Sequence, residues 1–125
     1  MDFLQFLAGG FELAASTGEN RKRLVASIID LMHICPMDGV DIDWEFPSWG
    51  HNFSRRFERD NFSHLLKDIR QEFDRHRLNT GKQLVLSAAV AAQITMINIC
   101  YRPKEIALYV DFINLMSYDY FIHKW

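Results

Sequence analysis

The stretch Asp38-Gly39-Val40-Asp41-Ile42-Asp43-Trp44-Glu45 decides how this chain folds. From Gly39 onward apolar and acidic residues alternate, and a repeat of two residues is typical of a β-strand with two unlike faces. Asp41, Asp43 and Glu45 therefore share one face, at steps of about 6.6 Å for a rise of about 3.3 Å per residue. The opposite face carries three apolar side chains, those of Val40, Ile42 and Trp44.

The segments around this strand predict an alternation of helices and strands. Ser16 and Glu19 form a capping-box pattern, after which apolar residues recur at helical spacing. The predicted elements are helices at about 17–33, 60–75 and 103–109 and strands at about 39–45, 84–92 and 112–118. Because helices and strands alternate, the crossovers are expected to be right-handed and the sheet parallel, which is an α/β fold.

The bulk composition excludes several classes of protein. The 125 residues are 49% hydrophobic and 24% charged, as in a globular domain, and the net charge is -2. Such a charge offers no basic surface to nucleic acid or to an anionic membrane, and no apolar stretch is long enough to span a bilayer. The N-terminus lacks the positive leading region of a signal peptide. Cys35 and Cys100 could be paired or free.

The acidic face of the strand at 39–45 indicates chemistry. The neighbouring strands, around Leu86 and Leu115, are almost continuously apolar, so the sheet is expected to be covered on both sides. Three acids buried together should titrate as one unit, with at least one carboxyl protonated near neutral pH. A general acid needs such a proton. Glu45, at the carboxyl end of the strand, is the predicted donor because reacting groups lie at that end of parallel barrels.

Two other interpretations of the three acids are open. They could form a hydrated polar face of a sheet that is exposed on one side. Alternatively, Asp41, Asp43 and Glu45 could hold a divalent metal ion, since hard cations prefer carboxylate oxygens. No glycine-rich phosphate loop accompanies them, so we predict neither a metal site nor a cofactor.

The stretch from Asp38 through Pro47 resembles the signature of family 18 of the glycoside hydrolases, the chitinase family. Two further segments resemble that family: Leu86-Ser87-Ala88-Ala89-Val90-Ala91 resembles its next strand, and Met116-Ser117-Tyr118-Asp119 its Met-x-Tyr-Asp motif. The resemblance implies a (β/α)8 TIM barrel, which needs about 250 residues. Residues 1–125 would then be a fragment of the catalytic barrel, roughly units three to six of eight.

The resemblance also implies an activity, the hydrolysis of β-1,4 N-acetylglucosamine linkages in chitin or chito-oligosaccharides. The mechanism would be retaining and substrate-assisted, with the sugar's own N-acetyl group as nucleophile and no cofactor. Glu45 would protonate the glycosidic oxygen and Asp43 would orient the acetamido group. Asp41 would tune Asp43 through a hydrogen bond and a shared proton, while Asp38 would support packing at the start of the strand.

By the same resemblance, the sugar site would include three residues of the last motif. Tyr118 would donate a hydrogen bond to the acetamido carbonyl oxygen, with Met116 and Asp119 lining the same site. Trp49 and Trp125 are candidates for stacking on sugar rings. The expected partner is chitin or an N-acetylglucosamine oligosaccharide, and the expected location is extracellular.

The alternative function is that of a chitinase-like lectin, which binds chitin without cleaving it. Such relatives typically have the glutamate or its aspartate partners replaced, whereas this chain carries all of them. A partial barrel would also leave the outer strands as open edges with apolar faces. We therefore predict low solubility or self-association for the isolated chain.

Overall fold

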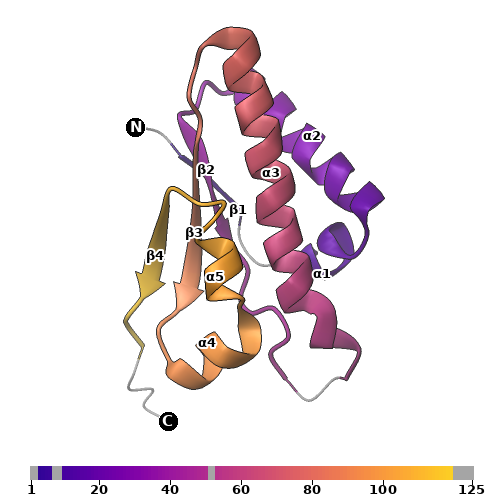
Figure 1. Ribbon diagram of the computed structural model, residues 1–125, viewed down its shortest axis with the longest axis vertical. Helices are drawn as coiled ribbons and strands as arrows, with labels where there is room; N and C mark the ends of the chain where they lie inside the picture. The colour runs from indigo at the N-terminus through magenta and orange to yellow at the C-terminus, as the bar shows by residue number, and fades with distance from the viewer. Residues whose placement is uncertain (1–2, 7–9, 51–52, 120–125) are drawn as a thin grey trace.

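Four parallel strands form one sheet in the order β1-β2-β3-β4 in the computed structural model, which describes residues 3–6, 10–50 and 53–119 (Figure 1). The strands are β1 (Phe3–Phe6), β2 (Gly39–Asp43), β3 (Val85–Ala91) and β4 (Phe112–Met116). The helices are α1 (Phe11–Ala15), α2 (Gly18–Ile34), α3 (Glu58–Thr80), α4 (Ile94–Cys100) and α5 (Pro103–Ile106), with a 3-10 turn, η1 (Phe53–Phe57). The predicted α/β class with a parallel sheet is confirmed.

The register of the central strands depends on a close approach at Gly39. This residue pairs with Val85 of β3, and the Val85 amide donates to the Asp38 carbonyl at 2.9 Å. A Cβ atom at Gly39 would lie 2.1 Å from the Val85 carbonyl oxygen, so no larger residue fits without moving the strand. The same register places Asp41 opposite Ser87.

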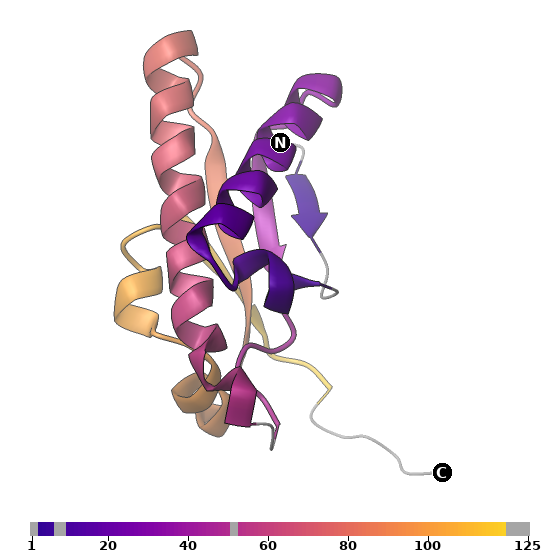
Figure 2. The ribbon, with the colours of Figure 1, turned by 90° about the vertical axis from the view of Figure 1, so that its right-hand side faces the viewer.

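Helices α1, α2 and α3 lie on one side of the sheet, as Figures 1 and 2 show. Trp44, 1% exposed, fills the space beneath them. Its ring stacks on Phe11 of α1 at 5.5 Å and meets Phe62 of α3 edge-on at 6.1 Å. The apolar face of the acidic strand therefore packs against the helices, as the alternation predicted. Among the described helices, none combines the length and apolar character needed to cross a membrane.

The start of α2 differs from the prediction. Its N-cap is Thr17, whose hydroxyl accepts from the Asn20 amide at 3.1 Å, so the predicted capping box of Ser16 and Glu19 is wrong. Ser16 instead ends α1, and its hydroxyl donates to the Leu13 carbonyl at 2.7 Å. Because Ser16 ends the short helix α1, α2 begins one residue later than predicted.

Other element bounds also move. Helix α3 is longer than predicted, because it continues to Thr80 although its last buried apolar residue is Phe73. Gly81, with φ of 75°, ends the helix in the left-handed conformation that glycine adopts readily. The predicted helix at 103–109 is shorter, and α1, α4 and β1 were not predicted. Each of these three elements has seven residues or fewer, too few for a periodic pattern to stand out.

Strand β4 lies at an edge of the sheet and is largely exposed. Ile113 is 43% exposed and Leu115 is 55% exposed, although both belong to the apolar run that predicted a buried strand. The described residues thus form an open four-stranded sheet with an uncovered apolar edge, as predicted for a partial barrel.

Candidate active site

Strand β2 carries two of the predicted acids into the interior. Asp41 is 7% exposed and Asp43 is 5% exposed, and all five residues of β2 are buried. The interpretation of a hydrated acidic face is therefore wrong for these two carboxyls. Glu45 lies two residues beyond the last residue of β2 and is exposed.

The Asp41 carboxylate is fixed by side chains from two neighbouring strands. Its Oδ1 atom accepts from the Ser87 hydroxyl at 2.5 Å and from the Asn114 side-chain amide at 3.0 Å. The three residues therefore form a polar row across β2, β3 and β4. Buried carboxylates need such donors because burial without hydrogen bonds is costly. Ser87 and Asn114 were not singled out from the sequence, where the signal is a polar residue within an apolar strand.

A cavity of about 520 Å³ opens at the carboxyl ends of β2, β3 and β4. Its lining brings together four of the six predicted site residues, Glu45, Met116, Tyr118 and Asp119. Asp41 and Asp43 are not part of the lining and lie earlier on β2. The lining also includes residues that were not predicted, among them Phe46, Gln93 and Met96. The last two come from the segment that begins α4, a helix without a clear sequence pattern.

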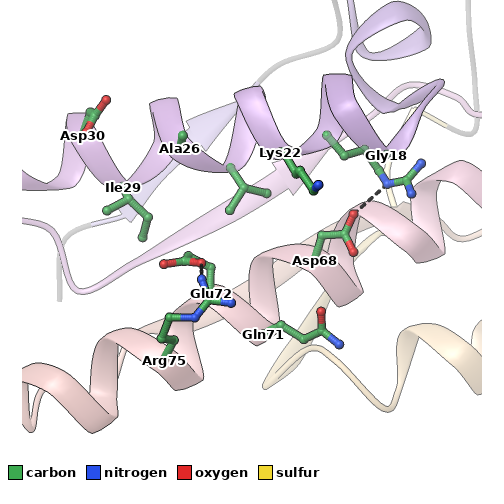
Figure 3. A pocket seen from close by; sticks show the side chains of 11 residues that line it. Gly18, Lys22, Ala26, Ile29, Asp30, Asp68, Gln71, Glu72 and Arg75 are labelled. Atoms are coloured by element: carbon green, nitrogen blue, oxygen red, sulfur yellow. Dashed lines mark hydrogen bonds and ion pairs between the residues drawn. The ribbon is translucent and has the colours of Figure 1, made fainter.

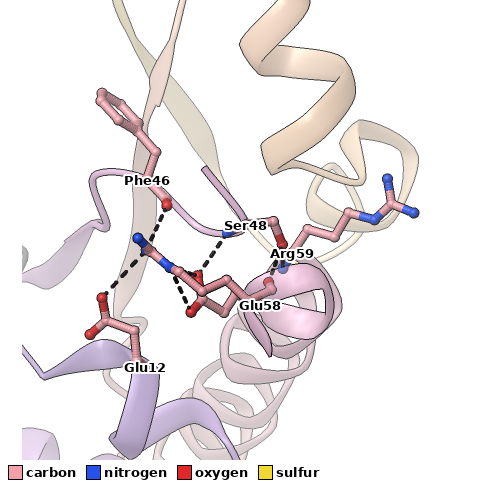
Figure 4. A network of polar contacts seen from close by, with 6 residues as sticks. Glu12, Phe46, Ser48, Glu58 and Arg59 are labelled. Carbon is pink, nitrogen blue, oxygen red and sulfur yellow. Dashed lines mark hydrogen bonds and ion pairs between the residues drawn. The ribbon is translucent and has the colours of Figure 1, made fainter. Parts of the chain in front are cut away.

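A hydrogen-bond network holds the loop that follows Glu45 (Figure 4). Arg55 donates through Nε to both carboxylate oxygens of Glu58 at 3.0 Å and through an NH2 group to the Phe46 carbonyl at 3.2 Å. Glu58 also accepts from the Ser48 amide at 2.8 Å. Glu12 of α1 reaches the same guanidinium at 3.4 Å. The loop after the candidate acid is thus tied to the start of α3.

Two titratable groups lie buried beside this loop. Burial raises the pKa of the Cys100 thiol to about 11, and the thiol is free, as is that of Cys35. Burial also raises the pKa of Tyr101 above its usual range, and the negative charges of Asp43 and Glu45 act in the same direction. The Tyr101 hydroxyl accepts from the Ala91 amide at 3.1 Å, at the rim of the cavity. It therefore stays neutral at physiological pH and fixes the end of β3.

The interpretation of a shared metal site is not supported. In the part of the chain that the structure describes, no three His, Cys, Asp or Glu side chains are grouped closely enough to hold one ion. Trp49, a candidate for sugar stacking, is 41% exposed in the loop after β2. Trp125 lies outside the described residues.

A second hollow, of about 660 Å³, lies between α2 and α3 (Figure 3). It is lined by charged residues of both signs, and Arg21 spans it to bind Asp68 at 2.7 Å. It is remote from the carboxyl ends of the strands. Since Arg21 pairs with Asp68 and Arg75 pairs with Glu72, we do not assign it the chemistry of the acidic strand.

Known proteins resemble this chain over almost all of its length. The sequence profile of Glycosyl hydrolases family 18 matches residues 5–125. Chitotriosidase-1 of Mus musculus is 35% identical over 106 residues, which are 84% of this chain and 22% of that protein. The chain therefore belongs to family 18 of the glycosyl hydrolases.

Solved structures of a chitinase and of a pseudo-chitinase are similar to this chain. Chitinase ChiW of Paenibacillus sp. str. FPU-7 matches 94% of this chain with a TM-score of 0.85 and 34% identity. Human YKL-39, described as a pseudo-chitinase with retained chitooligosaccharide binding properties, matches 94% with a TM-score of 0.82 and 27% identity. This chain spans 14% of the former and 32% of the latter. The similar structures thus include a chitinase and a pseudo-chitinase, and the chain corresponds to a minor part of either.

Proposed function

We propose that this chain is part of the catalytic domain of an enzyme that hydrolyses β-1,4 N-acetylglucosamine linkages in chitin or chito-oligosaccharides. The observation that carries the proposal is the placement of Glu45. Its carboxyl is exposed in a cavity shared with Met116, Tyr118 and Asp119, at the end of a strand whose earlier acids are buried. A proton donor must meet the substrate, whereas the acids that position and tune it need not.

The proposed catalytic steps use this arrangement. Glu45 protonates the glycosidic oxygen while the N-acetyl carbonyl oxygen of the sugar attacks the anomeric carbon, so the protein supplies no nucleophile. Asp43 orients the acetamido group. Asp41 is held by Ser87 and Asn114 and provides a fixed partner for Asp43, which limits the reorganisation that the reaction requires.

The sugar is bound at the part of the cavity that Met116, Tyr118 and Asp119 line. Tyr118 donates a hydrogen bond from its hydroxyl to the acetamido carbonyl oxygen, which stabilises the ring-closed intermediate. Met116 and Asp119 line the same site and restrict how the sugar can lie. The four strands correspond in this proposal to units three to six of an eight-stranded barrel, and the enzyme acts outside the cell, where its polymeric substrate occurs.

The decisive experiment compares substrates that differ only in the acetyl group. The complete catalytic barrel that contains this chain is incubated with N-acetylated and with deacetylated chito-oligosaccharides, and the products are separated by chromatography. We expect cleavage of the acetylated substrate, and a loss of about 100-fold or more in Glu45→Gln because general acid catalysis contributes about that much. Glu19→Gln, an exposed residue on α2, is the matched control and should keep the full rate.

Two results would contradict the proposal. Equal cleavage of the deacetylated substrate would show that the acetamido group is not the nucleophile. Absence of cleavage, together with tight binding of the acetylated oligosaccharide, would favour the second candidate, a chitin-binding lectin. The similarity to YKL-39 supports that candidate, because a chitinase fold can keep oligosaccharide binding without hydrolysis.

A further inference from the structure

The segment from Glu45 to Ser48 has to be held without the help of the sheet. The ladder between β2 and β3 ends at Asp43 and Ala89, so the backbone of Glu45 lies beyond the last paired residue. Ser48 adopts a φ of 61°, in the left-handed region that side chains rarely occupy. A conformation of this kind persists when the surrounding contacts determine it.

Those contacts converge on the ion pair between Arg55 of η1 and Glu58, the first residue of α3. The Glu58 side chain is 9% exposed and receives the Ser48 amide and the Arg55 guanidinium. The Ser48 hydroxyl donates to the Arg55 carbonyl at 2.8 Å and accepts from the Arg59 amide at 3.0 Å. Because Glu58 is the first residue of α3, the helix N-terminus adds to the attraction for its charge.

We propose that Arg55 and Glu58 are positioning residues that set the location of the Glu45 carboxyl, a role that rests on the proposed function. Arg55 donates a hydrogen bond to the carbonyl of Phe46, the residue that directly follows Glu45 and lines the cavity. Glu58 accepts a hydrogen bond from the amide of Ser48, two residues further on. Both ends of the turn are thus fixed by one ion pair that joins η1 to the start of α3.

The chain offers a closely matched control for this pair. Arg21 also donates Nε to a carboxylate, that of Asp68 at 2.7 Å, and NH1 to a backbone carbonyl, that of Ala15 at 3.0 Å. This pair joins α2 to α3 and lies away from the cavity at the strand ends. A lysine at either arginine keeps the charge but loses the planar fork that binds both partners at once.

The test compares Arg55→Lys with Arg21→Lys in the complete catalytic barrel that contains this chain, by two measurements. Hydrogen exchange at the Ser48 and Trp49 amides should become about tenfold faster or more in Arg55→Lys and stay near the parent rate in Arg21→Lys, since local opening sets this rate. With an acetylated chito-oligosaccharide, Arg55→Lys should lower kcat about tenfold to 100-fold and leave KM within about twofold, as misplacement by about 1 Å does. Arg21→Lys should leave both constants close to those of the parent.

The outcomes separate this inference from the proposed function. If the parent does not hydrolyse the substrate, the proposed function fails, and the exchange rates alone decide whether the pair holds the loop. Unchanged exchange in Arg55→Lys, an unchanged kcat, or equal losses in Arg21→Lys would each overturn the inference. Should Arg55→Lys fail to fold, Glu58→Gln, which keeps the side-chain shape and removes its charge, is judged by the same criteria.

Discussion

Replacement of Gly39 by alanine tests the register that aligns the acidic strand with its neighbour. The added Cβ would lie 2.1 Å from the Val85 carbonyl oxygen and 2.8 Å from its carbon. To restore a separation of 3.0 Å, the carbonyl oxygen has to retreat by about 0.9 Å. That movement would strain the neighbouring bond between the Val85 amide and the Asp38 carbonyl, now 2.9 Å long.

The cost of this change can be estimated from its two parts. Forcing an extra methyl group into a packed interior costs about 1–3 kcal/mol, and a lost backbone hydrogen bond costs about 1 kcal/mol more. We therefore expect Gly39→Ala to lower the free energy of unfolding by about 2–4 kcal/mol. A large part of the stability of a small domain would be lost.

The assay is urea unfolding followed by circular dichroism, with the slope and midpoint fitted for each variant. Gly18→Ala is the control, because its nearest non-adjacent atom is the end of the Arg21 side chain at 3.7 Å and it lies at the start of a helix. This variant should be neutral or slightly stabilising, by up to about 1 kcal/mol. Equal stabilities for the two variants would refute the close approach at Gly39.

Two further predictions concern buried groups near the site. Ser87→Ala removes the 2.5 Å donor of the buried Asp41 carboxylate and should lower the free energy of unfolding by about 1.5–3 kcal/mol. Ser63→Ala, also buried but with a long 3.4 Å bond, should cost clearly less, and the reverse order would contradict this reasoning. Burial raises the pKa of the Cys100 thiol from 9.0 to about 11. The neutral thiol therefore contributes its full stability below pH 9.0. This contribution is lost as the pH rises towards 11, because the thiol of the unfolded chain ionises first. Urea unfolding across that pH range should show a steeper decline in the free energy of unfolding for the parent than for Cys100→Ala. Alkylation of the native chain should modify Cys35 alone. Equal slopes, or rapid alkylation of Cys100, would refute the burial of Cys100.

The main features of the acidic strand could be predicted from the sequence because successive side chains of a strand point to opposite faces of the sheet. It placed Trp44 beneath the helices and the acids on the other face. The residues that hold the acids could not be predicted in the same way. Asn114 reaches Asp41 only because two intervening strand pairings bring distant segments together, and a pattern within one segment carries no information about such pairings.

The loop network illustrates a second limit. Arg55 and Glu58 lie three residues apart and, from the sequence, are an ordinary pair of opposite charges near a helix start. Their importance comes from contact with Phe46 and Ser48, which belong to a turn whose backbone conformation is not periodic. Short or irregular segments, including α4 with its contribution to the cavity, are decided by tertiary packing and not by local preference.

The hydrogen bond between Asp41 and Asn114 has a consequence for synthesis of the protein. The two residues are 73 positions apart, and Asn114 lies on the last strand of the described chain. During translation, Asp41 leaves the ribosome well before Asn114 is added, at about 5–20 residues per second. The nascent polypeptide thus carries the acidic strand for several seconds before the polar row that fixes Asp41 can form. The Asp41 carboxylate is therefore fixed by Asn114 only when β4 pairs with β3.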